Sequence, residues 1–339
     1  MPQPTILVTG ANGFLGFAVC RAFSQAGWRT YGLMRKDTIA AELISEEITP
    51  IIGSPAEPHF VSSLPAVDVI ATCSEDLNNY DHHFNDVLAL IRQIGQASRA
   101  LGGDKPLVIF SSGCKDYGMG LKHGEAGLAP HTEESPLKSH PLLVKRTEAA
   151  VKMLTLRDEF DCVVTRPTTF FGRSGSNYAY FFALAEQAKA QCHGLLTIPS
   201  SPDTILHGTH VDDVAAAYLA IATSPRDLVA GKAYNISGHR YETLGEIVSV
   251  MEKSHGITVS YKDPEPRDEE VFGLYAMVLV GWPQWVGSEK LRKDTGWKDR
   301  KPLFHEGYDV YRKAYEIQAA GKTEQFQRVA ERAPRLYAE

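Results

Sequence analysis

Short apolar runs alternate with longer amphipathic stretches along the first half of the chain. The apolar runs predict β-strands at residues 5–9, 30–34, 48–52, 67–72, 107–111 and 162–166. Amphipathic stretches at residues 14–26, 80–101 and 142–157 predict the intervening helices. Short, uniformly apolar strands separated by helices indicate a parallel sheet that is covered on both faces.

The hydrophobic pattern loosens after about residue 170. Helices are expected at residues 178–191, 214–223, 244–255 and 303–320, separated by loops that contain proline and glycine. We therefore expect a first domain over residues 1–170 and a smaller lobe over residues 171–320, with part of residues 205–240 woven back into the first domain. Residues 321–339 are expected to form a charged tail.

A glycine-rich stretch, TGANGFLG, joins the first predicted strand to the first predicted helix. Gly10 suits the tight turn, Gly13 lets the backbone approach a pyrophosphate, and Gly16 lets the helix pack closely on the sheet. The phosphates would lie at the helix N-terminus, where free N–H groups and the dipole favour anions. This spacing between a strand and a helix predicts a dinucleotide site, and a structural turn without a ligand is the alternative.

The residues after the second predicted strand bear on the choice of dinucleotide. An acidic residue there would bind the ribose 2′-hydroxyl of NAD, but this strand is followed by Arg35 and Lys36. Two cations suit the 2′-phosphate of NADP, and the Arg35 guanidinium can stack on the adenine. The sequence therefore favours NADP, and a solvated basic pair is the alternative.

Composition and charge narrow the class of protein further. Of the 339 residues, 43% are hydrophobic and 22% are charged, as in ordinary globular proteins. The formal net charge of −6 argues against nucleic acid or an anionic membrane as a partner. The five cysteines lack Cys-x-x-Cys spacing, and no signal-peptide pattern or membrane-length apolar run is present. These features predict a cytoplasmic protein with free thiols and no metal site.

Further motifs follow the glycine loop over nearly the whole chain. They are VDVIATCS at 67–74, Asn85 in the next helix, RPTTFFG at 166–172, HGTHVDDVAAA at 207–217, YNISG at 234–238 and SEKLRKDTGW at 288–297. Together with TGANGFLG, they resemble the motifs of extended short-chain dehydrogenases/reductases of the epimerase/dehydratase type. The resemblance implies an α/β fold with a Rossmann-type doubly wound parallel sheet and a smaller C-terminal lobe that binds the substrate.

The resemblance also implies which residues contact the dinucleotide. Besides the three glycines, Arg35 and Lys36, the expected contacts are Asn12, Phe14, Leu15, Ser54, Thr72, Ser74, Lys145, Pro167 and Thr169. Ser54 stands where the family usually has an aspartate near the adenine. The helices at residues 80–101 and 142–157 form a dimer face in many relatives, so a homodimer is expected.

Two positions that handle protons in the family are empty in this sequence. In the family, a Ser or Thr orients the substrate oxygen, the tyrosine of a YxxxK pair moves the proton, and its lysine holds the nicotinamide ribose. Lys145 matches the lysine, but Pro141 takes the place of the tyrosine. In SSGCKDYG, Gly113 stands four residues before Tyr117, where the Ser or Thr is expected. A shift of one residue would bring Ser112 to that position without supplying the tyrosine.

A different proton donor would explain this gap. The loop GCKDY resembles, more weakly, the GxKxY segment of the progesterone 5β-reductase/iridoid synthase branch, whose lysine takes part in enone reduction, and Lys115 matches that lysine. A desolvated lysine with a lowered pKa can donate a proton or stabilise an oxyanion, whereas a solvated loop charge is the alternative. Tyr117 and Tyr178 are further candidates, with packing as the alternative role of Tyr117.

One leading function and two alternatives follow. The leading function is an NADP(H)-dependent oxidoreductase that acts on a small carbonyl or enone metabolite through a non-standard catalytic centre. The alternatives are a redox-neutral isomerase, lyase or dehydratase that keeps NADP bound, and a non-catalytic, NADP-responsive regulatory protein. Aromatic residues in the expected pocket segments, among them Phe171, Trp282 and Trp285, favour an apolar or aromatic substrate, and a purely structural core is the other interpretation.

Overall fold

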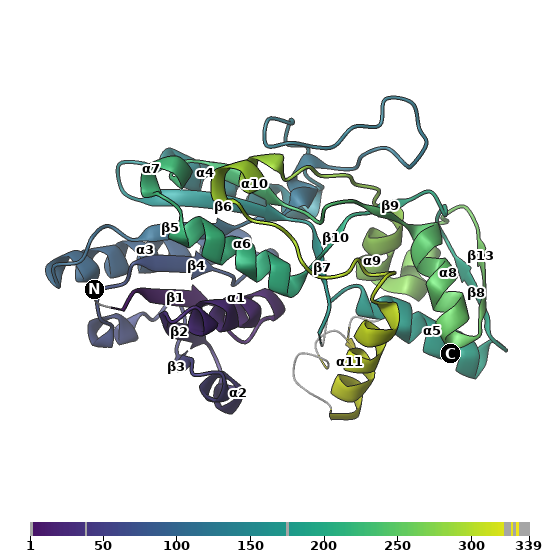
Figure 1. The fold of residues 1–339 in the computed structure, drawn as a ribbon, viewed down its shortest axis with the longest axis horizontal. Coiled ribbons are helices and arrows are strands. Elements are labelled where there is room, and N and C mark those ends of the chain that lie inside the picture. Colours follow the sequence, from purple (N-terminus) through teal and green to yellow (C-terminus); the bar gives the residue numbers. More distant parts are fainter. Residues whose placement is uncertain (1–2, 38, 174–175, 322–326, 328–329, 332–339) are drawn as a thin grey trace.

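A computed structural model describes residues 3–37, 39–173, 176–321, 327 and 330–331. A seven-stranded parallel sheet forms the centre of the N-terminal part, in the order β11-β6-β5-β4-β1-β2-β3 (Figure 1). The strands are β1 (Thr5–Thr9), β2 (Arg29–Met34), β3 (Thr49–Ile52), β4 (Val69–Thr72), β5 (Leu107–Ser111), β6 (Asp161–Pro167) and β11 (Ala233–Ile236). The predicted doubly wound parallel sheet is confirmed.

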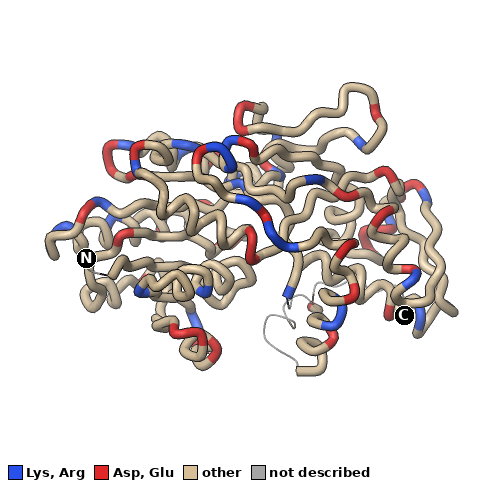
Figure 2. The backbone as a smooth tube through the Cα atoms, in the orientation of Figure 1, with Lys and Arg blue, Asp and Glu red and all other residues tan. Residues whose placement is uncertain are grey.

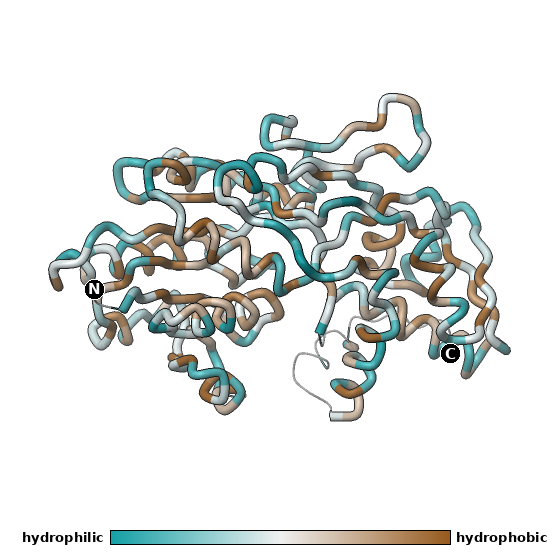
Figure 3. Tube along the Cα trace, viewed as in Figure 1, coloured by the Kyte–Doolittle hydropathy of each residue, from teal (hydrophilic) through white to brown (hydrophobic). Residues whose placement is uncertain are grey.

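Helices cover both faces of this sheet because its inner strands are apolar on both sides. In β1, Ile6 and Val8 point into one hydrophobic cluster and Leu7 into another, as alternating side chains of a strand must. Strands β1, β4 and β5 are hydrophobic in Figure 3 and carry no charged residue in Figure 2. The covering helices are α1 (Phe14–Gln25) and α6 (Val211–Thr223) on one face, and α3 (Tyr80–Ala100) and α4 (Val144–Thr155) on the other.

The chain returns to the sheet after it has left β6. Strand β11 pairs in parallel with β6, and α6 packs against α1 through Val211, Val214 and Ala215. Both elements lie within residues 205–240, the segment that the sequence predicts to return to the first domain. This return brings the segment YNISG to the carboxyl edge of the sheet, beside the end of β6.

The C-terminal lobe is built from helices and short strand pairs, on the right of Figure 1. Its helices are α5 (Ala179–Gln191), α8 (Leu244–His255), α9 (Asp268–Gly281) and α11 (Tyr308–Gly321). The pairs join β7 (Thr169–Phe171) to β10 (Gly208–His210), β9 (Ile205–Leu206) to β12 (Glu242–Thr243) and β8 (Leu195–Ile198) to β13 (Thr258–Tyr261).

Shorter elements occur along the whole chain. They are α2 (Ala40–Ser45), α7 (Arg226–Val229), α10 (Glu289–Thr295) and 3₁₀ turns at His59–Ser63, Leu77–Asn79, Cys114–Tyr117 and Pro141–Leu143.

Some boundaries differ from the sequence-based expectation for local physical reasons. The helix expected from residue 303 begins only at Tyr308, because the Glu242 carboxylate accepts the N–H groups of Phe304 (3.1 Å) and His305 (2.7 Å) and holds them in a turn. The sequence does not predict helix α9, since after its three acidic residues at the start it has no polar face, and it is broken at Gly273, where φ is +74°. Most of the expected charged tail lies outside the described residues.

An aromatic cluster forms the core of the C-terminal lobe. The Phe304 ring lies at its centre, 4.8–6.0 Å between centroids from the rings of Phe171, Tyr178, Phe181, Phe182, Tyr308 and Tyr311. Most of the aromatic residues that the sequence suggests for a substrate pocket are therefore core residues, including Phe171, Tyr178 and Phe181.

Removal of the central ring should destabilise this lobe. We expect Phe304→Ala to lower the free energy of unfolding by about 3–5 kcal/mol, since it removes a buried aromatic ring and leaves a cavity. Val310→Ala on neighbouring α11 is the matched control, because Val310 is 69% exposed. Urea denaturation followed by circular dichroism measures both variants, and equal stabilities for the two would contradict this role of Phe304.

Candidate active site

The glycine loop has the geometry that a pyrophosphate requires. Gly10 has a φ of +66°, and a Cβ at this position would lie 2.8 Å from the carbonyl oxygen of Cys73. Gly13 caps α1 in extended backbone, and a Cβ there would lie 3.1 Å from the carbonyl oxygen of Gly10. The first turn of α1 contains no acidic residue, so its free N–H groups attract an anion. This loop also contains the other expected contacts Asn12, Phe14 and Leu15.

Other expected cofactor residues lie at the carboxyl ends of the same strands, where ligands sit in open α/β sheets. The hydroxyl of Thr72, the last residue of β4, accepts the N–H of the residue that ends β5 (3.3 Å). Ser74 and Thr9 are joined through their hydroxyl groups (2.9 Å). The edge continues with Pro167 and Thr169, at the end of β6 and the start of β7.

Arg35, Lys36 and Ser54 share one part of this edge. The two cations follow β2 directly and are exposed. The N–H of Gly53 donates to the carbonyl of Met34 (2.9 Å), which brings Ser54 next to them. The three residues therefore lie where the adenosine end of a dinucleotide would reach from the glycine loop.

The segment SSGCKDYG forms a turn that is organised by a buried carboxylate. Asp116 has no exposed surface, and it accepts hydrogen bonds from the hydroxyls of Ser112 (2.5 Å) and Thr147 (3.0 Å). The Arg146 guanidinium donates to it from 2.9 Å, and Nε of Arg166 lies 3.4 Å away. Ser112, expected as a substitute for the family serine, is therefore engaged by Asp116.

The start of α4 directs two neighbouring cations to opposite sides. Lys145, the residue that matches the family lysine in sequence, is 55% exposed and pairs with Asp81 (3.6 Å) and Glu148 (3.2 Å). Its hydrogen bond to Glu148 raises the pKa of Lys145. Arg146 turns inward, and a Cβ at Gly113 would lie 3.1 Å from its Nη2 atom. The cation nearest to the missing Ser or Thr is thus Arg146.

Lys115 lies half-buried in the same turn. Its ammonium is 4.9 Å from the centre of the Trp282 ring, and burial lowers the pKa of Lys115 to about 8. The indole N–H of Trp282 donates to the carbonyl of Gly118 (3.2 Å), and the Gln284 side-chain amide donates to the carbonyl of Cys114 (2.8 Å). The C-terminal lobe therefore holds the surroundings of Lys115 in place.

The two candidate tyrosines lie in buried positions. Tyr117 is 1% exposed, its hydroxyl donates to the Asn235 side chain (2.7 Å), and burial raises its pKa to about 12. Its ring stacks on His131 with 5.4 Å between the centroids. Tyr178 lies in the aromatic core, where burial raises its pKa well above the usual value. Neither phenol is placed as openly at the sheet edge as the Lys115 ammonium.

Comparison with protein families agrees with this arrangement. The model of the family described as "NAD dependent epimerase/dehydratase family" matches residues 6–237, which include the glycine loop, the SSGCKDYG turn and YNISG. The chain belongs to this family. The fold resemblance drawn from the sequence motifs is thereby confirmed.

Individual relatives of this epimerase/dehydratase chain are distant. The spore coat polysaccharide biosynthesis protein SpsK of Bacillus subtilis (strain 168) is 24% identical over 270 residues, 77% of this chain and 86% of that protein. The 2-alkyl-3-oxoalkanoate reductase of Stenotrophomonas maltophilia (strain K279a) is 24% identical over 327 residues, 86% of this chain and 94% of that protein. The crystal structure of dTDP-glucose 4,6-dehydratase from Bacillus anthracis in complex with NAD has a TM-score of 0.70 at 16% identity and covers 94% of this chain and 98% of its own.

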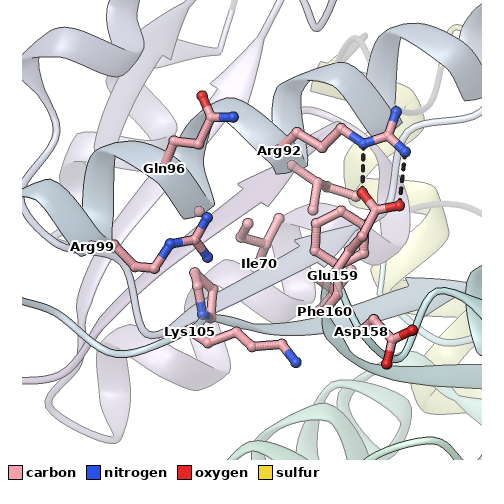
Figure 4. A pocket seen from close by; sticks show the side chains of 12 residues that line it. Ile70, Arg92, Gln96, Arg99, Lys105, Asp158, Glu159 and Phe160 are labelled. Carbon is pink, nitrogen blue, oxygen red and sulfur yellow. Dashed lines mark hydrogen bonds and ion pairs between the residues drawn. The ribbon is translucent and has the colours of Figure 1, made fainter.

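A cavity of about 490 Å³ lies elsewhere in this family member (Figure 4). Its lining residues include Ile70 and Val108, near the amino ends of β4 and β5, so it faces away from the ligand edge. On its rim, the Arg92 guanidinium forms two hydrogen bonds with Glu159 (2.7 and 3.0 Å), and Lys105 pairs with Asp161 (3.2 Å). The paired rim charges give this cavity no evident role in the chemistry.

The described residues offer neither a membrane-spanning helix nor a metal cluster. In that part of the chain, no helix is both long and apolar enough to cross a membrane. The same residues contain no group of three or more His, Cys, Asp or Glu side chains that is arranged to hold a metal ion. The five cysteines are free.

The sequence did not single out four residues that organise the turn, Asp116, Arg146, Arg166 and Gln284, and it suggested the fifth, Trp282, only as an aromatic residue of the substrate pocket. The sequence contains a signal for Arg146 in the spacing of apolar residues along its helix. In α4, Ala150 and Met153 are buried, and they lie four and seven residues after Arg146, on the same helical face. This pattern indicates that position 146, and not 145, faces the interior. The contacts of Trp282 and Gln284 have no such local signal.

The buried carboxylate of this family member should be essential for stability. Asp116→Asn leaves the Arg146 and Arg166 guanidiniums without their common counter-ion, so we expect a loss of about 3–5 kcal/mol in the free energy of unfolding. The control Glu148→Gln, on the helix α4 that also carries Arg146, removes a partner of exposed Lys145 and should lower the free energy of unfolding by less than about 1 kcal/mol. Chemical denaturation compares the two variants, and a small effect for both would show that Asp116 is dispensable.

Proposed function

We propose that this chain is an NADPH-dependent oxidoreductase that reduces a small carbonyl or enone and uses Lys115 as its proton donor. The observation that carries the proposal is the position of the Lys115 ammonium. It lies after the carboxyl end of β5, next to the Trp282 ring, and burial lowers its pKa to about 8. An acid with a pKa close to neutral pH is what proton transfer to a developing alkoxide requires.

In this proposal, Lys115, Asp116 and Trp282 each have a separate role. The glycine loop would hold the dinucleotide, which would supply a hydride to the carbonyl carbon or to the β-carbon of an enone; the products would be the alcohol or the saturated ketone and the oxidised cofactor. Lys115 holds the carbonyl oxygen, stabilises the negative charge that develops on it and donates the proton. Asp116 fixes the turn that carries Lys115, through its contacts with α4 and β6. The half-buried Trp282 ring offers an apolar wall for the substrate.

A redox-neutral reaction is the second candidate. It is favoured by the solved structures that share the fold, which include a dTDP-glucose 4,6-dehydratase with NAD and a UDP-glucose 4-epimerase with UDP-glucose. The reductase is favoured by a relative that matches 86% of this chain and is named as a 2-alkyl-3-oxoalkanoate reductase. Net oxidation of NADPH in the presence of a carbonyl compound separates the two, because a redox-neutral reaction returns the hydride.

The basic pair after β2 should select the cofactor. Arg35 and Lys36 are exposed at the adenosine end of the site, where a 2′-phosphate would receive charge-assisted hydrogen bonds. We expect NADPH to bind more tightly than NADH, and Arg35→Asp to weaken NADPH by about 1–3 kcal/mol while NADH changes little. Isothermal titration calorimetry measures both cofactors. Equal affinities in the parent protein would reject the preference for NADP.

Lys115 should control turnover and its pH dependence. Lys115→Met should retain NADPH affinity and lower the rate of NADPH oxidation by about a hundredfold, the usual cost of losing such a group. With a pKa of about 8, Lys115 is protonated below this pH and neutral above it, so reduction by the parent should slow as the pH rises through about 8. Cyclohexenone and benzoylacetate serve as trial substrates. A parent rate that is matched by Lys115→Met, with the same pH profile, would exclude Lys115 as the donor.

A further inference from the structure

The space of the missing family Ser or Thr is occupied by a guanidinium. A Cβ at Gly113 would lie 3.1 Å from Nη2 of Arg146 and 3.4 Å from both its Cζ and Nη1 atoms. These distances are tighter than most Cβ contacts in real proteins, so a side chain at position 113 would require the guanidinium to shift by a few tenths of an ångström. Gly113 and Arg146 therefore form a matched pair, in which the absence of one side chain makes room for the other.

The positive charge of Arg146 has only one buried counter-ion in the described part of the chain, and Arg146 shares it with a second arginine. Asp116 is the shared counter-ion of Arg146 (2.9 Å) and Arg166 (3.4 Å), so one buried carboxylate serves two guanidiniums. The remaining partner of Arg146 is Glu75, which lies 3.6 Å from Nη1 and is 42% exposed. Among the described residues, Nε of Arg146 is buried without a hydrogen-bond partner. The side chain of Arg146 is 12% exposed, and its Nη1 atom faces the exposed carboxylate of Glu75.

A second cation and an apolar wall lie around the same turn. Lys115 and Arg146 flank Gly113 along the turn and α4, and the charge of Arg146 acts on Lys115. The Trp282 ring covers Lys115, and Met119 and Leu142 are 56% exposed on the two segments next to it. A ligand that fits these surroundings has two oxygen functions, one of them anionic, and an apolar substituent.

We infer that Arg146 binds a carboxylate of the substrate in the place of its exposed partner Glu75, and that the substrate is an oxo acid with an apolar or aromatic substituent. A guanidinium binds a carboxylate through two parallel hydrogen bonds, which fixes its orientation as well as its position. The incoming carboxylate replaces exposed Glu75 as the second counter-ion of the two arginines. This inference rests on the proposed function, because it assigns the reacting oxo group to Lys115.

The test compares two probes of nearly the same shape, one anionic and one neutral. Benzoylacetate carries a carboxylate, and benzoylacetamide carries a neutral amide of nearly the same shape. Isothermal titration calorimetry on the full chain with NADP⁺ present should show that the parent binds benzoylacetate roughly tenfold or more tightly than the amide. Arg146→Gln should bring this ratio close to one, and Arg146→Lys should retain part of it. Lys152→Gln, which removes an exposed cation from the same helix, should leave the ratio unchanged.

A second variant covers the event that Arg146→Gln does not fold. Gly113→Ser keeps Asp116 and both of its arginines, but its side chain points at the guanidinium. It should weaken benzoylacetate roughly tenfold and leave benzoylacetamide unaffected. Equal or undetectable binding of the two probes by the parent, or a ratio that survives in both variants, overturns the inference.

The binding ratio is independent of turnover, so the two proposals fail separately. Lys115→Met should keep the preference for benzoylacetate while NADPH oxidation is lost. A parent that prefers benzoylacetate but never oxidises NADPH would support the carboxylate site and reject the reductase. A parent that reduces both probes and binds them with equal affinity would support the reductase and reject the carboxylate site.

Discussion

The candidate site depends on one buried ion cluster, in which the carboxylate of Asp116 meets two guanidiniums. A charge without exposed surface is tolerated only when it is paired and hydrogen-bonded, and Asp116 has Ser112, Thr147, Arg146 and Arg166 around it. These partners come from α4, from β6 and from Ser112 directly after β5, so the cluster joins three parts of the chain at the carboxyl edge of the sheet. The orientation of α4 and the course of the turn that carries Lys115 both follow from this pairing.

The cluster changes the chemistry of the edge without changing its architecture. The glycine loop, the ends of β1 and β4 and the return of β11 are arranged as a dinucleotide site of this family requires. The positions that would carry a serine and a tyrosine hold Gly113 and a proline, and the group nearest to Gly113 is the guanidinium of Arg146. A hydroxyl both donates and accepts hydrogen bonds, whereas a guanidinium or an ammonium only donates. The site is therefore suited to an oxygen that is negative or becomes negative during the reaction.

The C-terminal lobe contributes the other half of the surroundings. The loop that follows the turn forms backbone hydrogen bonds with this lobe, from the N–H of Gly120 to Pro283 and from the N–H of His131 to Trp285, each 2.8 Å long. The same segment brings Trp282 over Lys115 and Gln284 against the turn. Burial of the ammonium, and with it the lowered pKa of Lys115, is thus a consequence of packing between the two parts of the chain.

The sequence by itself determined the sheet, its flanking helices and the glycine loop, because these follow from hydrophobic periodicity and from backbone conformations that only glycine adopts at low cost. It also marked Lys115, through the resemblance of the GCKDY loop to the GxKxY segment. Only the tertiary structure decided which cation of α4 faces the site. One residue along a helix turns the side chain by about 100°, so Lys145 and Arg146 differ entirely in environment although they are neighbours in sequence. The contact between Lys115 and Trp282 could not be predicted from the sequence either, since the two residues lie far apart along the chain and meet only where the lobes pack together.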